Sequence, residues 1–239
     1  MKIAIPTYNR PACVSYELAK SIVGEDNVYV FFHNVEDASQ YKINIKNKII
    51  TNTPRGAAIA KNSILNFFKA GEEIVLMDDD VTSVSKLSFD SKKLIKLKPF
   101  EILKEFEKCF EICKKNNCFL WGIYPVENYF FMKHKISNKC LLVGHILGVI
   151  INDLRFDENL PVKNDYDYAL QNIVKYKKVA RFDFLTCDGK VNSKGGLDYI
   201  YKSKDLYEKD FNKFMEKWSG YSGFKLKINP KRKNEVLLI

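Results

Sequence analysis

The sequence predicts an α/β fold in which a mixed, mainly parallel central sheet is flanked by helices within a single domain. Strand-like and helix-like segments alternate through the first half of the chain, which is the pattern of βαβ units. The 239 residues suffice for one large domain, and a hydrophobic content of 46% supplies its core. Three consecutive aspartates follow an apolar segment, as expected where a strand reaches the ligand-binding edge of such a sheet.

The first half of the chain shows the clearest alternation of strands and helices. Segments rich in Val, Ile and Phe predict strands, and segments with apolar residues at helical spacing predict helices. The expected strands are 2–6, 28–32, 48–50 and 74–77, and the expected helices are 12–22 and 56–68. Between them, the polar stretch 34–47 is expected to form loop and short helix. Ala70-Gly71 is expected to end the second helix.

The second half continues with further helices and strands. Amphipathic patterns predict helices at 99–116, 162–176 and 203–218, and apolar runs predict strands at 119–124, 143–151 and 180–187. The lysine-rich stretch 90–99 is expected to be a loop. The basic stretch 225–233 is expected to be only partly ordered. No internal repeat and no linker divides the chain.

Charge and targeting signals narrow the class of protein. The net charge of +10 favours polyanionic partners, although an AT-rich genome would also enrich lysine. A strand at the amino terminus leaves no room for a signal peptide, and no apolar run reaches the ~20 residues of a membrane helix. We therefore expect a cytoplasmic protein (host cytoplasm if phage-encoded) with no membrane partner and no obligate protein partner.

The six cysteines contain no CxxC pair. Cys109 and Cys113 lie four residues apart on an expected helix and Cys118 follows, so a structural zinc site is one reading. Buried thiols in a reducing compartment are the favoured reading, because free cysteine packs as a small hydrophobe.

The run Asp78-Asp79-Asp80 leaves the apolar strand 74–77. Carboxylate oxygens at a strand end suit Mg²⁺ or Mn²⁺ that carries a diphosphate, because the cation offsets the repulsion between acids and phosphate. The alternative is an acidic, solvated turn.

Two further segments supply groups for a nucleotide. The first expected strand ends in Pro6-Thr7-Tyr8-Asn9-Arg10, where Tyr8 can contact a base or ribose and Arg10 a phosphate. Arg55-Gly56 precedes a helix whose free N–H groups attract phosphate. A proline-bounded turn and a closely packed helix are the alternatives. Neither a GxGxxG nor a Walker sequence is present, which disfavours dinucleotide and P-loop folds.

In order and spacing, these three motifs resemble those of the GT-A glycosyltransferases. The resemblance implies a GT-A (Rossmann-like) fold, a nucleotide-sugar donor (UDP-sugar expected) and Mn²⁺ or Mg²⁺. It implies that Asp78 approaches the ribose or the metal and that Asp80 is the main metal ligand. Lys61 stands where the family has Arg in Ala-Arg-Asn. The implied donor-binding residues are Pro6, Thr7, Tyr8, Arg10, Arg55, Lys61, Asn62, Asp78, Asp79 and Lys194.

The second half supplies an acidic motif, Asn164-Asp165-Tyr166-Asp167, at the start of an expected helix. It resembles the helix-start acids of inverting GT-A enzymes, which implies that Asp165, or alternatively Asp167, is the general base. The alternative is an acid that only stabilises the helix terminus. We assign no catalytic role to the three histidines, His33, His134 and His145.

A glycine-rich loop at 187–196 follows the last expected strand. In the related enzymes such a loop closes over the diphosphate, which implies Asp188 or Asn192 as a further metal ligand and Lys194 as a partner of the leaving diphosphate. A plain surface turn is the alternative. The chain then divides into a donor and metal half (1–90), an acceptor half (91–224) and a basic tail (225–239).

The closest resemblance is to the TET-associated glycosyltransferases of bacteriophages, carried by Asp165-Tyr166-Asp167, Gly195-Gly196 and the single-domain length. It implies that the acceptor is a hydroxymethylated pyrimidine in phage DNA. Bases would then stack on exposed aromatic residues, for which the candidates are Trp121, Tyr124, Tyr129 and Phe130. The rivals are a glycosyltransferase for surface polysaccharide or protein, and a non-catalytic nucleic-acid-binding protein with a decayed sugar-nucleotide fold. A nucleotidyltransferase lacks support, because its glycine-rich, basic amino-terminal loop is missing.

Overall fold

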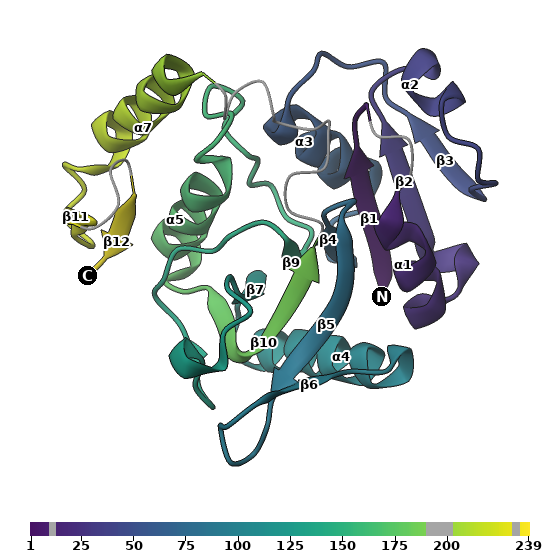
Figure 1. The fold of residues 1–239 in the computed structure, drawn as a ribbon. Coiled ribbons are helices and arrows are strands. Elements are labelled where there is room, and N and C mark those ends of the chain that lie inside the picture. The colour runs from purple at the N-terminus through teal and green to yellow at the C-terminus, as the bar shows by residue number, and fades with distance from the viewer. Residues whose placement is uncertain (10–12, 190–202, 231–234) are drawn as a thin grey trace.

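The computed structural model describes residues 1–9, 13–189, 203–230 and 235–239. Within them a ten-stranded sheet forms the centre of the molecule, in the order β3-β2-β1-β4-β9-β7-β10-β5-β6, with β8 paired to β10 beside this path (Figure 1). Its strands are β1 (Lys2–Thr7), β2 (Val28–Phe32), β3 (Asn47–Ile50), β4 (Glu73–Met77), β5 (Val81–Leu87), β6 (Leu94–Lys96), β7 (Leu120–Tyr124), β8 (Ile136–Ser137), β9 (Ile146–Ile150) and β10 (Ala180–Gly189).

The sheet is mixed. Strands β3, β2, β1 and β4 are parallel neighbours, and β7 and β10 form another parallel pair. Strand β9 lies antiparallel between β4 and β7, and β5 is antiparallel to both β10 and β6. The expected α/β class with a mixed sheet is confirmed.

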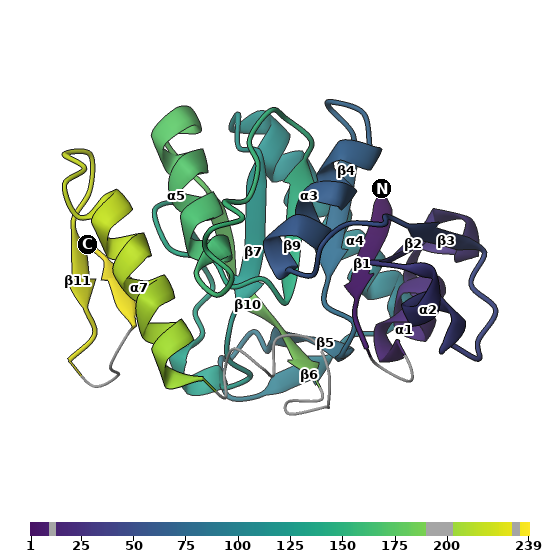
Figure 2. The same ribbon diagram turned by 90° about the horizontal axis from the view of Figure 1, so that it is seen from above.

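Helices cover both faces of the sheet. They are α1 (Val14–Val23), α2 (Val35–Ser39), α3 (Ala57–Phe67), α4 (Pro99–Lys115), α5 (Asn164–Tyr176) and α7 (Lys204–Trp218). Helices α1 and α4 pack on one face and α3, α5 and α7 on the other, so two hydrophobic cores sandwich the sheet. Helix α7 and the hairpin of β11 (Leu226–Ile228) and β12 (Val236–Leu238) lie beside α5, at the end of the molecule opposite β3 (Figures 1 and 2).

Local sequence explains the main elements. In α4 the buried residues recur at helical spacing, from Ile102 through Phe106 and Phe110 to Cys113. Pro99 occupies its first turn, where a missing N–H costs nothing, and the Glu101 carboxylate accepts the Lys98 N–H at 2.7 Å. Strand β1 buries three successive residues because helices cover both faces of the sheet.

Two expectations about the stretch after the triple aspartate need correction. The sequence analysis did not anticipate β5, because its polar residues Ser83 and Ser85 hide the strand pattern although both are buried. Part of the expected loop 90–99 forms the edge strand β6, whose lysines are typical of an exposed sheet edge. Within the basic stretch 225–233, expected to be partly ordered, Leu226–Ile228 form β11 and pair with β12.

The cysteines agree with the favoured sequence-based expectation. Cys13, Cys109, Cys113 and Cys118 are buried free thiols. Across the described ranges, no group of three His, Cys, Asp or Glu residues has an arrangement that could hold a metal, so the zinc alternative finds no support there. None of the described helices is long and apolar enough to cross a membrane.

Candidate functional site

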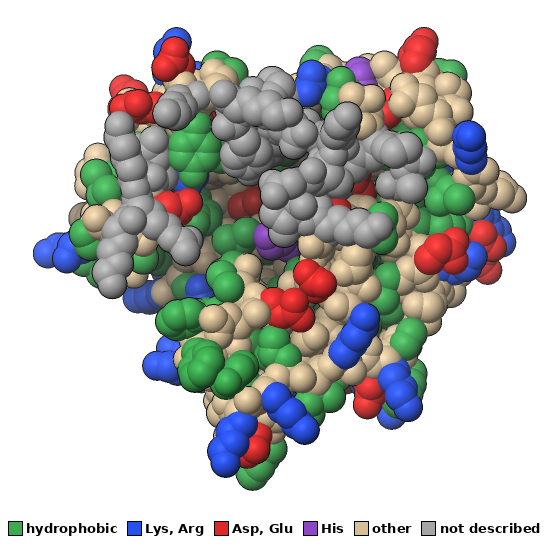
Figure 3. Space-filling view, in the orientation of Figure 1, with side chains coloured by type: hydrophobic (Ala, Val, Ile, Leu, Met, Phe, Trp, Pro, Cys, Tyr) green, Lys and Arg blue, Asp and Glu red, His purple; other side chains and the backbone are tan. Residues whose placement is uncertain are grey.

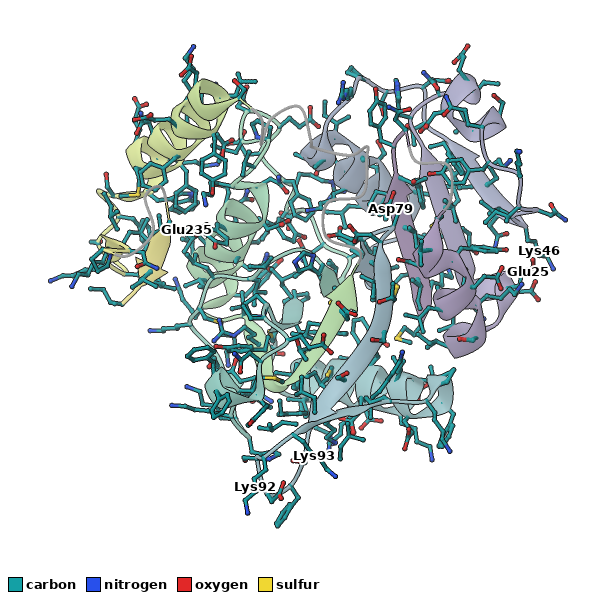
Figure 4. The ribbon with its side chains drawn as sticks, in the orientation of Figure 1. Glu25, Lys46, Asp79, Lys92, Lys93 and Glu235 are labelled. Atoms are coloured by element: carbon teal, nitrogen blue, oxygen red, sulfur yellow. The ribbon has the colours of Figure 1, made fainter. Side chains whose placement is uncertain are left out.

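The candidate site lies where β1 and β4 end at the same edge of the sheet. The triple aspartate follows β4 directly, and Thr7-Tyr8 ends β1 next to it. Figure 4 shows Asp79 beside β1 and the start of β5. On the face drawn in Figure 3, acidic side chains and a histidine lie together at the centre of the molecule. Parallel strands place their carboxyl ends together, so this edge is the usual place for a ligand.

Asp78 contacts His145. The β4–β9 pairing continues one residue beyond β4, because the Asp78 N–H donates to the His145 carbonyl at 3.0 Å. This pairing brings His145 Nδ1 within 3.2 Å of Asp78 Oδ2. The hydrogen bond to Asp78 raises the pKa of His145, and the charges of Asp80 and Asp165 add to the rise. The charges of Asp78, Asp80 and Asp165 therefore all act on one imidazole.

Sequence reasoning missed His145, and the reason is structural. His145 and Asp78 are 67 residues apart in sequence, and they come together only because β9 pairs antiparallel with β4. The only local signal was a histidine at the start of an expected strand.

Asp79 belongs to a buried network. Its carboxylate is 7% exposed and accepts a hydrogen bond from Thr7 Oγ1 at 2.6 Å. The Thr7 hydroxyl is also hydrogen-bonded to the hydroxyl of Tyr41, whose pKa is raised by burial. Thr7 and Asp79, both predicted to bind the donor, therefore tie the end of β1 to the turn after β4.

Helix α1 braces the backbone of the same turn. The buried Ser15 hydroxyl donates to the Asp78 carbonyl at 2.5 Å and lies 3.1 Å from the Val81 carbonyl. The Ser15 N–H donates to the Asp79 carbonyl at 3.3 Å. The carbonyl oxygens of the turn thus point toward α1, and its backbone is fixed from one side.

Asp80 lies against the end of β10. A Cβ added to Gly189 would stand 3.3 Å from the Asp80 carbonyl and 3.5 Å from its Oδ1. Asp188, predicted as a further metal ligand, is exposed one residue earlier, and its carbonyl accepts the Thr82 hydroxyl at 3.3 Å. Burial, with the charges of Asp78 and Asp80, raises the pKa of Cys187. The end of β10 therefore packs against the aspartate turn, residues 78–80.

A second group of side chains extends from the end of β1 toward β2. The Arg55 guanidinium lies 4.5 Å from the ring centroid of Tyr8, and that ring lies 5.3 Å from the ring of His33. The structure thus brings together two of the residues predicted to bind the donor. Pro6 lies within β1, opposite Phe31.

Asp37 lies beside this group and was not singled out in the sequence. Its Oδ1 accepts the Asn9 N–H at 2.7 Å, and the side chain is 4% exposed. Within the described part of the chain, its buried Oδ2 has no hydrogen-bond partner. Desolvation accordingly raises the pKa of Asp37. A buried acceptor without a donor is costly, which marks Oδ2 as a position for a ligand N–H or O–H.

Asp165 forms the opposite side of the site, in the first turn of α5. Its carboxylate makes an ion pair with Lys61, whose Nζ also donates to Asn164 Oδ1 at 3.1 Å. The Lys61 side chain is 8% exposed and that of Asp165 is 17% exposed. A Cβ at Gly144 would overlap the Asp165 carboxylate, so only glycine fits there. Gly144 precedes His145, which connects Asp165 to the aspartate turn.

Two other predicted residues have internal partners. Asn62 is clamped to the backbone of Phe156, accepting its N–H at 2.8 Å and donating to its carbonyl at 3.0 Å. Asp167 is completely buried and has three donors: Gln171 Nε2 at 2.6 Å, Lys217 Nζ at 2.7 Å and Trp218 Nε1 at 2.8 Å. The environments of Asp165 and Asp167 therefore differ sharply.

The remaining predicted residues are dispersed or outside the description. Arg10, Asn192 and Lys194 lie outside the described residues, as do Gly195 and Gly196. Trp121 is completely buried against Phe106 and Phe110, so it presents no stacking surface. Tyr124 lies under Arg181, and Tyr129 stacks on Phe130, which is 76% exposed.

The donor set at this edge suits a divalent cation completed by a substrate. Magnesium usually takes one or two carboxylates from the protein and its other ligands from phosphates and water. A site of this kind does not require three protein ligands in advance, which is compatible with the absence of such a group among the described residues. Asp78 and Asp80 provide hard oxygen atoms on one short, braced turn.

No model of a known protein family matches the chain, and no curated protein matches it. Among solved structures, the chain is similar to S. aureus TarS 1–349, with a TM-score of 0.48 and 12% sequence identity. The alignment covers 90% of this chain and 66% of the TarS chain, just under two thirds of it. So distant a likeness establishes no family, and the residues of the site carry the functional argument.

Proposed function

We propose that the protein is a glycosyltransferase that moves a sugar from a nucleotide-sugar to a hydroxyl acceptor. One observation carries the proposal: Asp78 contacts His145, and the Asp165 carboxylate lies against Gly144, the residue before His145, at the carboxyl edge of the sheet. Asp78 and Asp80 belong to the motif that resembles the GT-A metal site, and Asp165 to the motif that resembles the base. These two motifs lie more than 80 residues apart in sequence.

The donor is assigned to the side of the site formed by β1 and β2. Tyr8 and Arg55 offer a ring and a guanidinium for a nucleoside and its phosphates. Asp37 Oδ2, which has no hydrogen-bond partner among the described residues, would accept the ring N–H of a uracil, as a UDP-sugar would offer. Thr7 and Asp79 hold the wall of this subsite in place. Lys61, a predicted donor-binding residue, forms an ion pair with Asp165.

Asp78 and Asp80 would hold Mn²⁺ or Mg²⁺, with Asp188 as a further candidate. When bound, such an ion neutralises charge on the departing diphosphate. His145, whose Nδ1 lies 3.2 Å from Asp78 Oδ2, is a further polar side chain beside the proposed metal position.

Asp165 is the proposed general base. Its carboxylate accepts the proton of the acceptor hydroxyl, the oxygen attacks the anomeric carbon, and the electron pair of the broken C–O bond leaves with the nucleoside diphosphate. Lys61 fixes the orientation of the carboxylate. Asp167 is set aside as the base, because three donors already occupy it and no solvent reaches it.

For the acceptor we propose a hydroxymethylated pyrimidine in DNA. The net charge of +10 and the resemblance of Asp165-Tyr166-Asp167 to a motif of the phage enzymes support this choice. The runner-up acceptors are surface polysaccharide and protein.

The test is transfer itself. The protein is incubated with Mn²⁺, a panel of nucleotide-sugars and either hydroxymethylated or unmodified DNA, and the digested nucleosides are analysed by mass spectrometry. We expect a hexose-sized mass increase only on the hydroxymethylated base. Transfer to a saccharide but never to DNA would reject the DNA acceptor, and no transfer or donor hydrolysis with any donor would reject the glycosyltransferase.

The metal assignment has its own variant. Asp80→Ala should abolish Mn²⁺-dependent donor hydrolysis and leave the fold intact, because Asp80 lies on a turn and outside the core. Asp153→Ala, which removes an exposed aspartate paired with Lys175, is the matched control and should keep full activity. A folded Asp80→Ala protein with full activity would contradict the metal site.

A further inference from the structure

The C-terminal segment, described at residues 203–230 and 235–239, is bonded to the stretch 157–167. This stretch includes the loop before α5 and the first turn of α5, which carries Asp165. The contacts come from α7 and from the residue before β12, and they reach the stretch at three places. Their common target is the short part of the chain whose position determines where Asp165 lies.

The first contact is made by Asp210, in the middle of α7. Its side chain is 2% exposed, and its two oxygens accept the N–H groups of Val162 at 3.2 Å and Lys163 at 2.8 Å. Lys163 is the N-cap residue of α5 and makes no capping bond through its own side chain. Asp210 therefore supplies, from another helix, the acceptor that fixes the backbone entering α5.

The second contact lies on the other side of Asp165. Lys217 and Trp218, in the last turn of α7, both donate to the buried carboxylate of Asp167. Lys217 also pairs with Asp157 at 2.6 Å, which ties the loop before α5 to the same side chain. Asp165 thus lies between two points of attachment, at 162–163 and at 167.

The third contact closes the arrangement from the β12 side. Glu235, labelled in Figure 4, accepts the Tyr166 hydroxyl at 3.1 Å. Its other oxygen accepts the Tyr207 hydroxyl at 3.4 Å. The buried Nζ of Lys163 lies 3.2 Å from the Tyr207 hydroxyl and 3.6 Å from Glu235. Both neighbours of the Asn164-Asp165 pair are therefore held by the C-terminal segment.

We infer that the C-terminal segment positions Asp165 and that Asp210 is its main positioning residue, an inference that rests on the proposed role of Asp165 as base. A carboxylate base acts only within hydrogen-bond reach of the proton that it removes. A displacement of about 1 Å can cost about 100-fold in rate. Asp210 is assigned no contact with substrate or metal and acts through the backbone at the start of α5.

The test compares Asp210→Asn with the matched control Asp205→Asn, which changes an exposed aspartate on the same helix. The asparagine keeps one acceptor oxygen, so one of the two backbone N–H groups loses its partner. We expect turnover to fall about tenfold while donor affinity, measured by calorimetry without acceptor, changes less than twofold. Asp205→Asn should match the wild type in both measurements.

A loss of general stability must be separated from a loss of position. Phe106→Leu loosens the core on the face of the sheet away from α7. Assayed well below its melting temperature, it should keep its turnover even where its stability is as low as that of Asp210→Asn. Equal losses of turnover in these two variants would overturn the inference.

Hydrogen exchange provides a readout that does not depend on activity. In Asp210→Asn, the amides of residues 160–168 should exchange at least fivefold faster, while those of β1 and β4 remain unchanged. Unchanged exchange at 160–168 would overturn the inference even if turnover fell. If the wild type is inactive but Asp210→Asn still shows faster exchange at 160–168, the proposed function is rejected and the attachment by the C-terminal segment is kept. Normal turnover in Asp210→Asn would reject positioning and keep the function.

Discussion

Asp165 and Asp167 lie two residues apart at the start of α5, and their surroundings give them different tasks. Asp165 is partly exposed and has one lysine partner within the site. Asp167 is completely buried and satisfied by three donors from α5 and α7. A buried charge with complete hydrogen bonding stabilises a fold but has no oxygen available for a substrate proton.

This contrast yields a prediction for the two asparagine variants. Asp165→Asn should lower turnover about 100-fold, because the amide cannot accept a proton, while donor affinity and stability change little. Asp167→Asn should instead lower the free energy of unfolding by about 1–3 kcal/mol, because hydrogen bonds to a charged group are lost. Steady-state kinetics and urea unfolding measure the two effects. A large loss of turnover confined to Asp167→Asn would move the base by two residues.

At the scale of residues, the sequence predicted which residues form the site better than it predicted their contacts. The motif at 164–167 was enough to propose Asp165, with Asp167 as its alternative. The ion pair with Lys61 could not be predicted, because the two residues are 104 positions apart and meet only through the packing of α3 and α5. Asp37 was missed for a similar reason, because the burial of its Oδ2 away from every described donor is visible only in the fold.

At the scale of elements, local patterns sufficed for most strands and helices but not for strand order. Apolar periodicity is a property of a short window, so α3, α4 and β4 could be predicted to within two residues of their observed bounds. The antiparallel place of β9 between β4 and β7 is set by packing across the whole sheet. The contact between Asp78 and His145 follows from that order and was therefore beyond sequence reasoning.

Helix α1 supports a prediction about the aspartate turn. Ser15→Ala removes the buried hydroxyl that donates to the Asp78 carbonyl and lies 3.1 Å from the Val81 carbonyl, so the turn loses its side-chain contact with α1. The turn should lose about 1 kcal/mol of stabilisation, so the Mn²⁺ concentration for half-maximal donor hydrolysis should rise about 3- to 10-fold. Ser21→Ala, at the exposed end of the same helix, is the matched control and should behave as the wild type. Equal metal titrations for the two variants would show that α1 does not hold the turn.

At the scale of the whole molecule, the site and the hairpin formed by β5 and β6 lie far apart. The site is at the start of β5, and the lysine-containing turn of this basic hairpin, residues 88–93, is at its end. The strand begins directly after Asp80 and runs antiparallel to β10, so Ser88 to Lys93 lie at the far edge of the sheet. Figure 4 shows this separation, with Asp79 at one end and Lys92 and Lys93 at the other. Seven strand residues span about 23 Å, which equals about seven base pairs at 3.4 Å each. A DNA acceptor in the site would reach these lysines only if it were long enough.

The DNA proposal therefore predicts a dependence on acceptor length. Neutralising Lys92 and Lys93, both exposed, with Lys92→Gln/Lys93→Gln should raise the apparent KM for hydroxymethylated duplexes longer than about 15 base pairs and spare those of about 6. The salt dependence of binding should become shallower by about one to two in log–log slope, because fewer counterions are released. The double variant Lys42→Gln/Lys46→Gln, near the opposite sheet edge at β3, removes the same charge and should change neither quantity. Equal effects of both double variants at every length would show that net charge alone attracts the acceptor, and the hairpin would then have no specific role in DNA binding.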